Sequence, residues 1–103
     1  MTGSECPARW HLYVIRTLDG FLYSGISTNV PRRFKEHLSQ GSRTAKYLMA
    51  HKPGRLAFSM VIGDKSLALR VEYSFKRLAK KEKERIVKAK RLVFDKESGR
   101  IRI

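Results

Sequence analysis

Two short segments rich in β-branched and aromatic residues, separated by an Asp-Gly pair, limit most strongly what this chain can fold into. Residues 10–16 read WHLYVIR and residues 21–26 read FLYSGI, and alternation with a period of two in such residues is typical of strands. Asp19 and Gly20 favour a tight turn between them. The pattern predicts a β-hairpin with a three-residue loop, Leu18-Asp19-Gly20, in which Gly20 takes a positive φ.

The loop length sets the register of this predicted hairpin. It places Tyr13 opposite Gly25 and diagonal to Tyr23, so that both tyrosines project from one face of the sheet. A slip of one residue would place them on opposite faces. We interpret Gly25 as room for a neighbouring tyrosine and for close approach of the backbone.

The rest of the chain predicts helices and a third strand. Asn29 and the proline that follows it indicate a helix start, and Asp64 is expected to cap a later helix. A short helix is expected over 45–51 and a strand over 55–62, while 80–91 forms either a separate helix or a continuation of the helix before it. The predicted apolar stripes of the two main helices are Val30, Phe34 and Leu38 in the first, and Leu67, Val71, Phe75 and Leu78 in the second.

These elements predict a small α/β (α+β) fold, with a three-stranded, mainly antiparallel sheet flanked by helices. A chain of 103 residues forms one domain, which we place at 10–92 between an N-terminal extension (1–9) and a C-terminal tail (93–103). The lone cysteine, Cys6, excludes an intrachain disulfide and a cysteine-based zinc site. We expect a cytoplasmic protein, because the sequence has no signal-peptide pattern and no apolar run near the ~20 residues of a membrane span.

The net charge of +14 is the second constraint on function. A chain that needs only solubility does well with about 2–8 net charges, so the surplus indicates a polyanionic partner, above all nucleic acid. Membrane binding is not expected, because the basic stretch 80–90 offers only Ile86, Val87 and Ala89 as apolar residues.

Six residues, in order along the predicted elements, resemble the site of a GIY-YIG nuclease domain. His11-Leu12-Tyr13 and Tyr23-Ser24-Gly25 stand where that family has its two strand triplets. Arg33 and His37 match its Arg-x-x-x-His pattern and lie one turn apart on a helix face. Glu72, in the stretch ALRVE, matches the metal-binding glutamate of the family. The resemblance covers about 10–91 and is closest to the short stand-alone bacterial members of the YhbQ type.

The resemblance implies the fold predicted above and a metal-dependent endonuclease that hydrolyses phosphodiester bonds in DNA, with DNA favoured over RNA. Related domains occur in homing endonucleases, in an excision-repair nuclease and in some restriction enzymes, which connects the family to DNA repair. Glu72 would hold one Mg²⁺ or Mn²⁺ ion, since both prefer oxygen ligands. The implied catalytic residues are Tyr13, Tyr23, Arg33, His37 and Glu72.

The role of each catalytic residue follows from the chemistry of hydrolysis. Tyr13 and Tyr23 would orient or deprotonate the attacking water or bond the phosphate, Arg33 would bind the scissile phosphate, and His37 would shuttle a proton or touch phosphate. Contacts to the nucleic-acid backbone are expected from Arg32, Lys46 and Tyr47.

Other interpretations remain open at this point. The tyrosines could be aromatic packing residues, and Glu72 a surface glutamate paired with Lys65 or Lys76. The asparagine that many nuclease members carry after the glutamate is absent, since Asn29 is the only asparagine. A non-catalytic, basic nucleic-acid-binding module on the same fold is therefore the alternative function, and a small basic protein docked on a ribonucleoprotein is a third.

Overall fold

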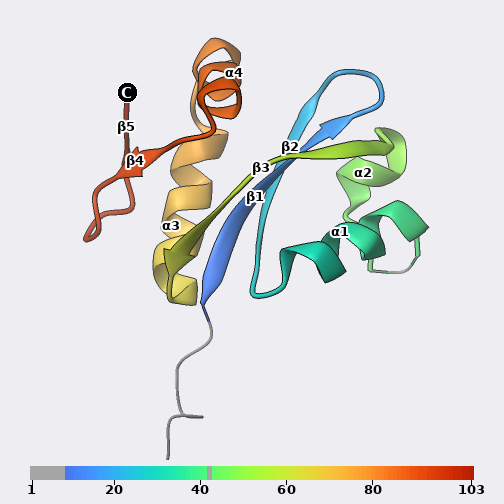
Figure 1. Cartoon of the computed structure of the whole chain (residues 1–103), viewed down its shortest axis with the longest axis horizontal. Helices are drawn as coiled ribbons and strands as arrows, with labels where there is room; N and C mark the ends of the chain where they lie inside the picture. The colour runs from blue at the N-terminus through green and yellow to red at the C-terminus, as the bar shows by residue number, and fades with distance from the viewer. Residues whose placement is uncertain (1–8, 42) are drawn as a thin grey trace, which may run out of the picture.

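The computed structural model describes residues 9–41 and 43–103, and Figure 1 shows a sheet with helices on both sides. Its three strands run in the order β2-β1-β3. Helices α1 and α2 lie on one side of the sheet, and α3 and α4 on the other (Figure 1). The elements are β1 (Trp10–Thr17), β2 (Leu22–Ser27), α1 (Val30–Ser39), α2 (Lys46–Ala50), β3 (Pro53–Gly63), α3 (Lys65–Lys76), α4 (Lys80–Ala89), β4 (Val93–Phe94) and β5 (Ile101–Arg102).

This arrangement confirms the predicted fold class, because β1 pairs antiparallel with both β2 and β3. Residues 1–8 of the expected N-terminal extension lie outside the described residues. No helix in the described part of the chain is both long enough and apolar enough to cross a membrane.

The hairpin of β1 and β2 has the predicted register. Tyr13 lies opposite Gly25, and Ile15 lies opposite Tyr23. The backbone N–H of Thr17 donates to the carbonyl of Phe21 at 2.8 Å, and Gly20 has a φ of 92° as predicted. Because side chains alternate along a strand, Tyr13 and Tyr23 share one face, and their ring centroids are 6.4 Å apart.

Both predicted helix caps are present. The side chain of Asn29 accepts a hydrogen bond from the backbone N–H of Arg32, and that of Asp64 accepts one from Leu67, so each occupies a backbone donor that the first helical turn leaves free. The open question about residues 80–91 is also answered. Ala79 has an extended backbone (ψ 152°), so α4 is a separate helix and not a continuation of α3.

The inward face of α1 differs from the prediction at its last position. Val30 is buried and Phe34 is half-buried, but Leu38 is 47% exposed and His37 is fully buried in its place. Positions 30, 34 and 37 share one face of a helix just as positions 30, 34 and 38 do. The prediction placed Leu38 on the inward face because leucine is the apolar one of the two residues. Here the hydrogen bond from His37 to Tyr13 offsets the cost of burying an imidazole.

Residues 93–103, expected as a tail, instead form a hairpin against α3. Strand β4 pairs with β5, and Gly99 forms the turn with a φ of 76°. Ile101 is buried, and its backbone N–H donates to Ser74 Oγ of α3 at 3.0 Å. Strands of two residues are too short to show alternation, so the sequence pattern carried no strand signal here.

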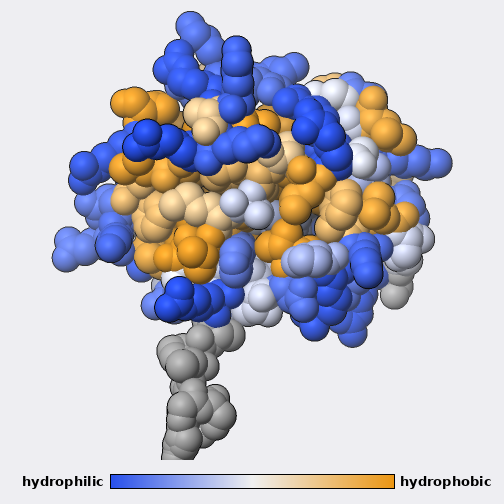
Figure 2. All heavy atoms as spheres, in the orientation of Figure 1, coloured by the Kyte–Doolittle hydropathy of each residue, from blue (hydrophilic) through white to orange (hydrophobic). Residues whose placement is uncertain are grey.

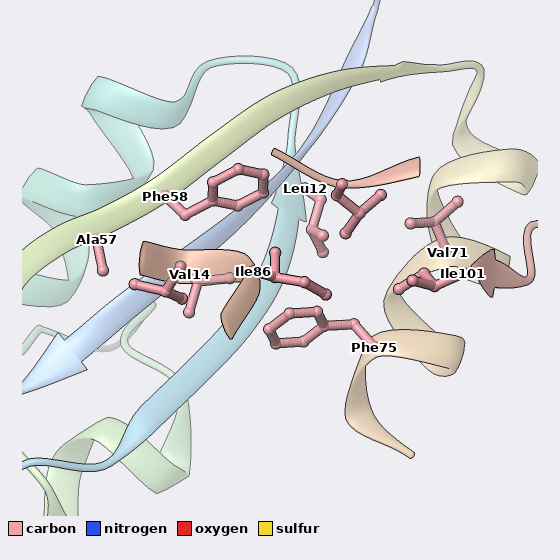
Figure 3. Close-up of a cluster of buried hydrophobic side chains, with 10 residues drawn as sticks. Leu12, Val14, Ala57, Phe58, Val71, Phe75, Ile86 and Ile101 are labelled. Carbon is pink, nitrogen blue, oxygen red and sulfur yellow. The ribbon is translucent and has the colours of Figure 1, made fainter. Parts of the chain in front are cut away.

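Hydrophobic residues form two interior clusters and also reach the surface. In Figure 2, hydrophilic residues gather above and below a band of hydrophobic residues. The larger apolar cluster packs the sheet against α3, α4 and the C-terminal hairpin (Figure 3). It consists of Leu12, Val14, Ala57, Phe58, Val71, Phe75, Ile86, Val87, Leu92 and Ile101. A smaller cluster on the side of α1 and α2 contains Tyr13, Ile15, Val30 and Leu48.

Candidate active site

Tyr13 is the centre of the candidate site, on the strand in the middle of the sheet. Its ring is buried, and its Oη lies 3.0 Å from Nε2 of His37 on α1. A Cβ atom on Gly25 would lie 2.6 Å from Cζ of Tyr13 and closer still to the hydroxyl oxygen. Only glycine leaves room for the ring in this position, which confirms the interpretation of Gly25.

The hydrogen bonds of His37 assign its tautomer. The backbone N–H of Ala45 points at Nδ1 at 3.5 Å, and an N–H can only donate. Nδ1 is therefore the acceptor and Nε2 carries the proton, so Nε2–H donates to Tyr13 Oη. This arrangement leaves the hydroxyl proton of Tyr13 free to donate to another group.

Burial keeps both groups neutral at neutral pH. It raises the pKa of Tyr13 well above its ordinary value; the nearby Tyr23 and Glu72 add to this rise in pKa, and Arg33 opposes it. Burial also lowers the pKa of His37 to about 4, with a further contribution from the positive charge of Arg33. The pair is an uncharged hydrogen-bonded unit beside a guanidinium group.

Arg33 is half-buried on α1, one turn before His37, and is held by two acceptors. Its Nη1 donates to Oε1 of Glu36 at 2.9 Å and to the carbonyl of Arg43 at 2.7 Å. The hydrogen bond from Arg33 lowers the pKa of Glu36. Sequence reasoning did not select Glu36, although its i, i+3 spacing from Arg33 is the signal that could have found it.

Glu72 lies on α3, which packs on the other side of the sheet from α1. Its side chain is only 16% exposed, and Oε2 lies 3.4 Å from Nζ of Lys76. The same Nζ lies 5.9 Å from the ring centroid of Tyr23. Of the two lysines named as partners of Glu72 from sequence, the structure therefore selects Lys76, while Nζ of Lys65 lies over the ring of Trp10.

Glu72 could hold a metal only in an open site. Among the described residues, no group of three or more His, Cys, Asp or Glu side chains could enclose an ion. A single, mostly buried carboxylate fits Mg²⁺ or Mn²⁺, because these ions keep several waters and bind substrate oxygens together with one or two carboxylates. Such a site would be completed by the phosphate of a bound substrate.

A row of aromatic rings extends from Tyr23 along the surface. Tyr47 stacks on Tyr23 at 5.9 Å and on His51 at 4.6 Å, and His51 meets the edge of Phe21. Sequence reasoning named Tyr47 and left His51 aside, although the two are four residues apart. Tyr47 is 40% exposed. The other two residues expected to contact nucleic acid, Arg32 and Lys46, are exposed as well.

The structure places Tyr13, Tyr23, Arg33 and His37 on the side of the sheet that α1 covers, while Glu72 lies on α3, which packs on the other side. The charges of Arg33 and Glu72 both influence the pKa of Tyr13. Residues 9–85 match the family model of the GIY-YIG catalytic domain. The chain belongs to the GIY-YIG family.

The relatives of this chain within that family are UPF0213 proteins. It is 53% identical to a UPF0213 protein of Citrobacter koseri over 78 residues, which is 76% of each chain. It is 50% identical to the UPF0213 protein YhbQ of Salmonella typhimurium over the same length and share of each chain. A solution NMR structure of a UPF0213 protein from Bacillus halodurans is 35% identical, with a TM-score of 0.51 over 80% of this chain and 85% of that one.

Proposed function

We propose that this protein is a divalent-metal-dependent endonuclease that hydrolyses phosphodiester bonds in DNA. The observation that carries the proposal is that Tyr13, packed against Gly25, is hydrogen-bonded to His37 and lies close enough to Arg33 and Glu72 for both charges to influence its pKa. A surface with a net charge of +14 would bring a polyanion to this site.

Arg33 is the residue placed to bind the scissile phosphate. A guanidinium group offers a planar pair of donors that matches two phosphate oxygens. In the structure, Arg33 Nη1 is shared between Glu36 and a backbone carbonyl. Glu36 therefore holds the guanidinium group of Arg33 in place before a substrate is bound.

Tyr13 acts as a neutral hydroxyl that orients the attacking water or a phosphate oxygen. Because His37 Nε2–H donates to its oxygen, the Tyr13 proton is free to point toward the substrate. Use of Tyr13 as a base would require cations to lower its pKa again, and Arg33 is the cation that already acts in this direction. Tyr23 supports this group from the same face of the sheet.

Glu72 would be the protein ligand of one Mg²⁺ or Mn²⁺ ion. When bound, such an ion neutralises charge on the phosphate and lowers the pKa of a coordinated water. The chain's own contribution is to hold the carboxylate on helix α3, close enough to Tyr13 to influence its pKa.

Two observations favour the alternative, a non-catalytic nucleic-acid-binding module on the same fold. Arg33 is engaged by Glu36 and by the carbonyl of Arg43, and the chain has no asparagine after Glu72. Such a module would bind nucleic acid through the same basic surface and would cleave nothing.

The substitution Glu72→Gln separates the two functions. It keeps the size of the side chain and the helix propensity but removes the negative charge. Loss of the carboxylate ligand is expected to lower cleavage on the order of 100-fold. Metal-free DNA binding should persist or become tighter, because a negative charge near the phosphates is gone.

Cleavage and binding are measured side by side on duplex, single-stranded, flap and branched DNA and on RNA, with Mg²⁺, Mn²⁺ or EDTA. Glu97→Gln, an exposed glutamate in the C-terminal hairpin, is the matched control. Equal cleavage rates for the parent and Glu72→Gln, with intact folding, would remove the metal role. A parent protein that binds but never cleaves would establish the binding module.

A further inference from the structure

A groove with a volume of about 800 Å³ lies between α3 and the C-terminal hairpin. It is lined by Leu69 and Tyr73 of α3 and by Arg77, the residue that follows the helix, spaced four residues apart. Tyr73 directly follows Glu72, so it projects about 100° around the helix from the candidate active site. None of the five candidate catalytic residues lines the groove, so it is a surface separate from the site described above.

The lining of this groove includes apolar side chains that remain in water. Leu69 is 47% exposed, Tyr73 is 63% exposed and Ile103 is 76% exposed. Single exposed apolar residues are common, but a group of them in one concavity marks a binding surface. Figure 2 shows hydrophobic residues extending over the side of the molecule where α3 and the hairpin lie.

The rim of the groove is positively charged. Arg70, Arg77 and Arg100 line it, and none of the lining residues is acidic. Within residues 9–41 and 43–103, these three arginines form no ion pair. Arg77 is already ordered, because its Nη1 donates to Tyr73 Oη at 3.1 Å and its guanidinium lies 5.5 Å from that ring.

We propose that this groove binds a segment of a partner protein that combines aliphatic and acidic side chains. The aliphatic side chains would cover Leu69, Tyr73 and Ile103, and the acidic ones would pair with the arginines of the rim. The proposal does not depend on the nuclease function.

Charge and chemistry separate this occupant from two others. A second copy of the chain would bring another +14 charge toward a rim that has no acidic residue. A single-stranded nucleic acid needs aromatic rings on which successive bases stack, and Tyr73 is the one aromatic residue among those that line the groove.

Four fluorescein-labelled probes test the proposal by fluorescence anisotropy. They are a ten-residue peptide of alternating Leu and Glu, the same peptide with Lys in place of Glu, the same peptide with Ser in place of Leu, and a ten-nucleotide oligothymidine. The Leu-Glu peptide is expected to bind at least tenfold more tightly than either other peptide. Equal binding of the Ser-Glu peptide would overturn the proposal, because it would mean that the apolar lining is not used.

A double substitution on α3, compared with a control substitution on α1, tests whether the peptide binds in the groove. Leu69→Gln combined with Tyr73→Gln is expected to weaken binding of the Leu-Glu peptide at least tenfold, and both side chains point to solvent, so folding should be retained. Leu38→Gln is the matched control, because Leu38 is a helical leucine with the same 47% exposure, on α1.

The charged rim is tested in the same way. Arg70→Gln with Arg100→Gln should weaken binding of the Leu-Glu peptide. Arg55→Gln with Arg91→Gln, at two exposed arginines outside the groove, should leave that binding unchanged. An equal loss of peptide binding in the groove variants and in their controls would overturn the proposal. So would oligothymidine binding that is lost only in the groove variants, because the groove would then be a nucleic-acid site.

Discussion

At the scale of single residues, the site depends on a small number of atoms that cannot move independently. The ring of Tyr13 fills the space above Gly25, and its hydroxyl group is fixed by a histidine that is itself fully buried. Because protein interiors are closely packed, a change at either end of this group is transmitted to the other.

Gly25→Ala is expected to destabilise the protein by about 1–3 kcal/mol, since the added methyl group overlaps the Tyr13 ring and forces it to shift. Denaturant unfolding measures the change. In a Tyr13→Leu background the same substitution should cost less, because the outer end of the ring is gone. Gly41→Ala is the control, since the nearest side-chain atom to its Cβ would be 3.5 Å away. An equal cost of Gly25→Ala in both backgrounds would contradict the packing argument.

His37 makes stability depend on pH. Its pKa is lowered to about 4 in the fold, against an ordinary value of 6.5. A depressed pKa means that its contribution is fully present above pH 6.5 and is lost as the pH falls toward 4. The total loss is on the order of 3 kcal/mol.

His37→Gln keeps a donor to Tyr13 but does not titrate. The free energy of unfolding, measured from pH 7.5 to pH 4, should therefore fall less steeply in His37→Gln than in the parent. Carboxylates that titrate in this range are common to both proteins and cancel in the comparison. Parallel curves would show that His37 is not held neutral by the fold.

At the scale of elements, α3 carries both the proposed metal ligand and a built-in cation beside it. The Lys76 Nζ lies 3.4 Å from Glu72, and a positive charge at that distance opposes a second cation. If Glu72 binds metal, Lys76→Met should raise the affinity for Mn²⁺ about fivefold. Titration of Mn²⁺ followed by electron paramagnetic resonance measures this. Lys88→Met removes an equal charge from the exposed face of α4, and an equal effect there would mean that only net charge matters.

The elements differ in how far the sequence could predict them. The β1–β2 hairpin and the starts of α1 and α3 were predictable, because Gly20, Asn29 and Asp64 mark them by local backbone chemistry. The C-terminal hairpin was not, since its two-residue strands are stabilised by contacts with α3 that lie far away in the chain.

The candidate site divides in the same way. The register that places Tyr13 opposite Gly25 follows from the turn. The burial of His37 instead of Leu38, and the hold of Glu36 on Arg33, depend on how α1 is rotated against the sheet. Tertiary packing determines that rotation. Helical periodicity alone does not decide whether position 37 or position 38 faces the sheet.

At the scale of the whole molecule, the charge of +14 predicts how nucleic-acid binding responds to salt. If about six to ten phosphates are neutralised, affinity should fall by about 10³–10⁵-fold between 50 and 200 mM salt, because bound counterions are released. Arg32→Gln with Lys46→Gln should reduce the slope of log affinity against log salt by about two. Arg70→Gln with Arg100→Gln, in the separate groove, should leave it unchanged. A flat salt dependence in the parent would mean that the charge does not contact a polyanion.

The central position of β1 determines the order in which parts of the molecule unfold. Tyr13 is paired through its backbone to Gly25 on one side and to Ser59 on the other, so its amide hydrogen exchanges with solvent only when the whole sheet opens. Tyr47, by contrast, lies on α2, a helix of five residues with no side-chain cap, which can open locally at much lower free energy. Heat or denaturant should therefore detach α2 with Tyr47 first, and the hydroxyl group of Tyr13 should lose its position only when the whole fold is lost.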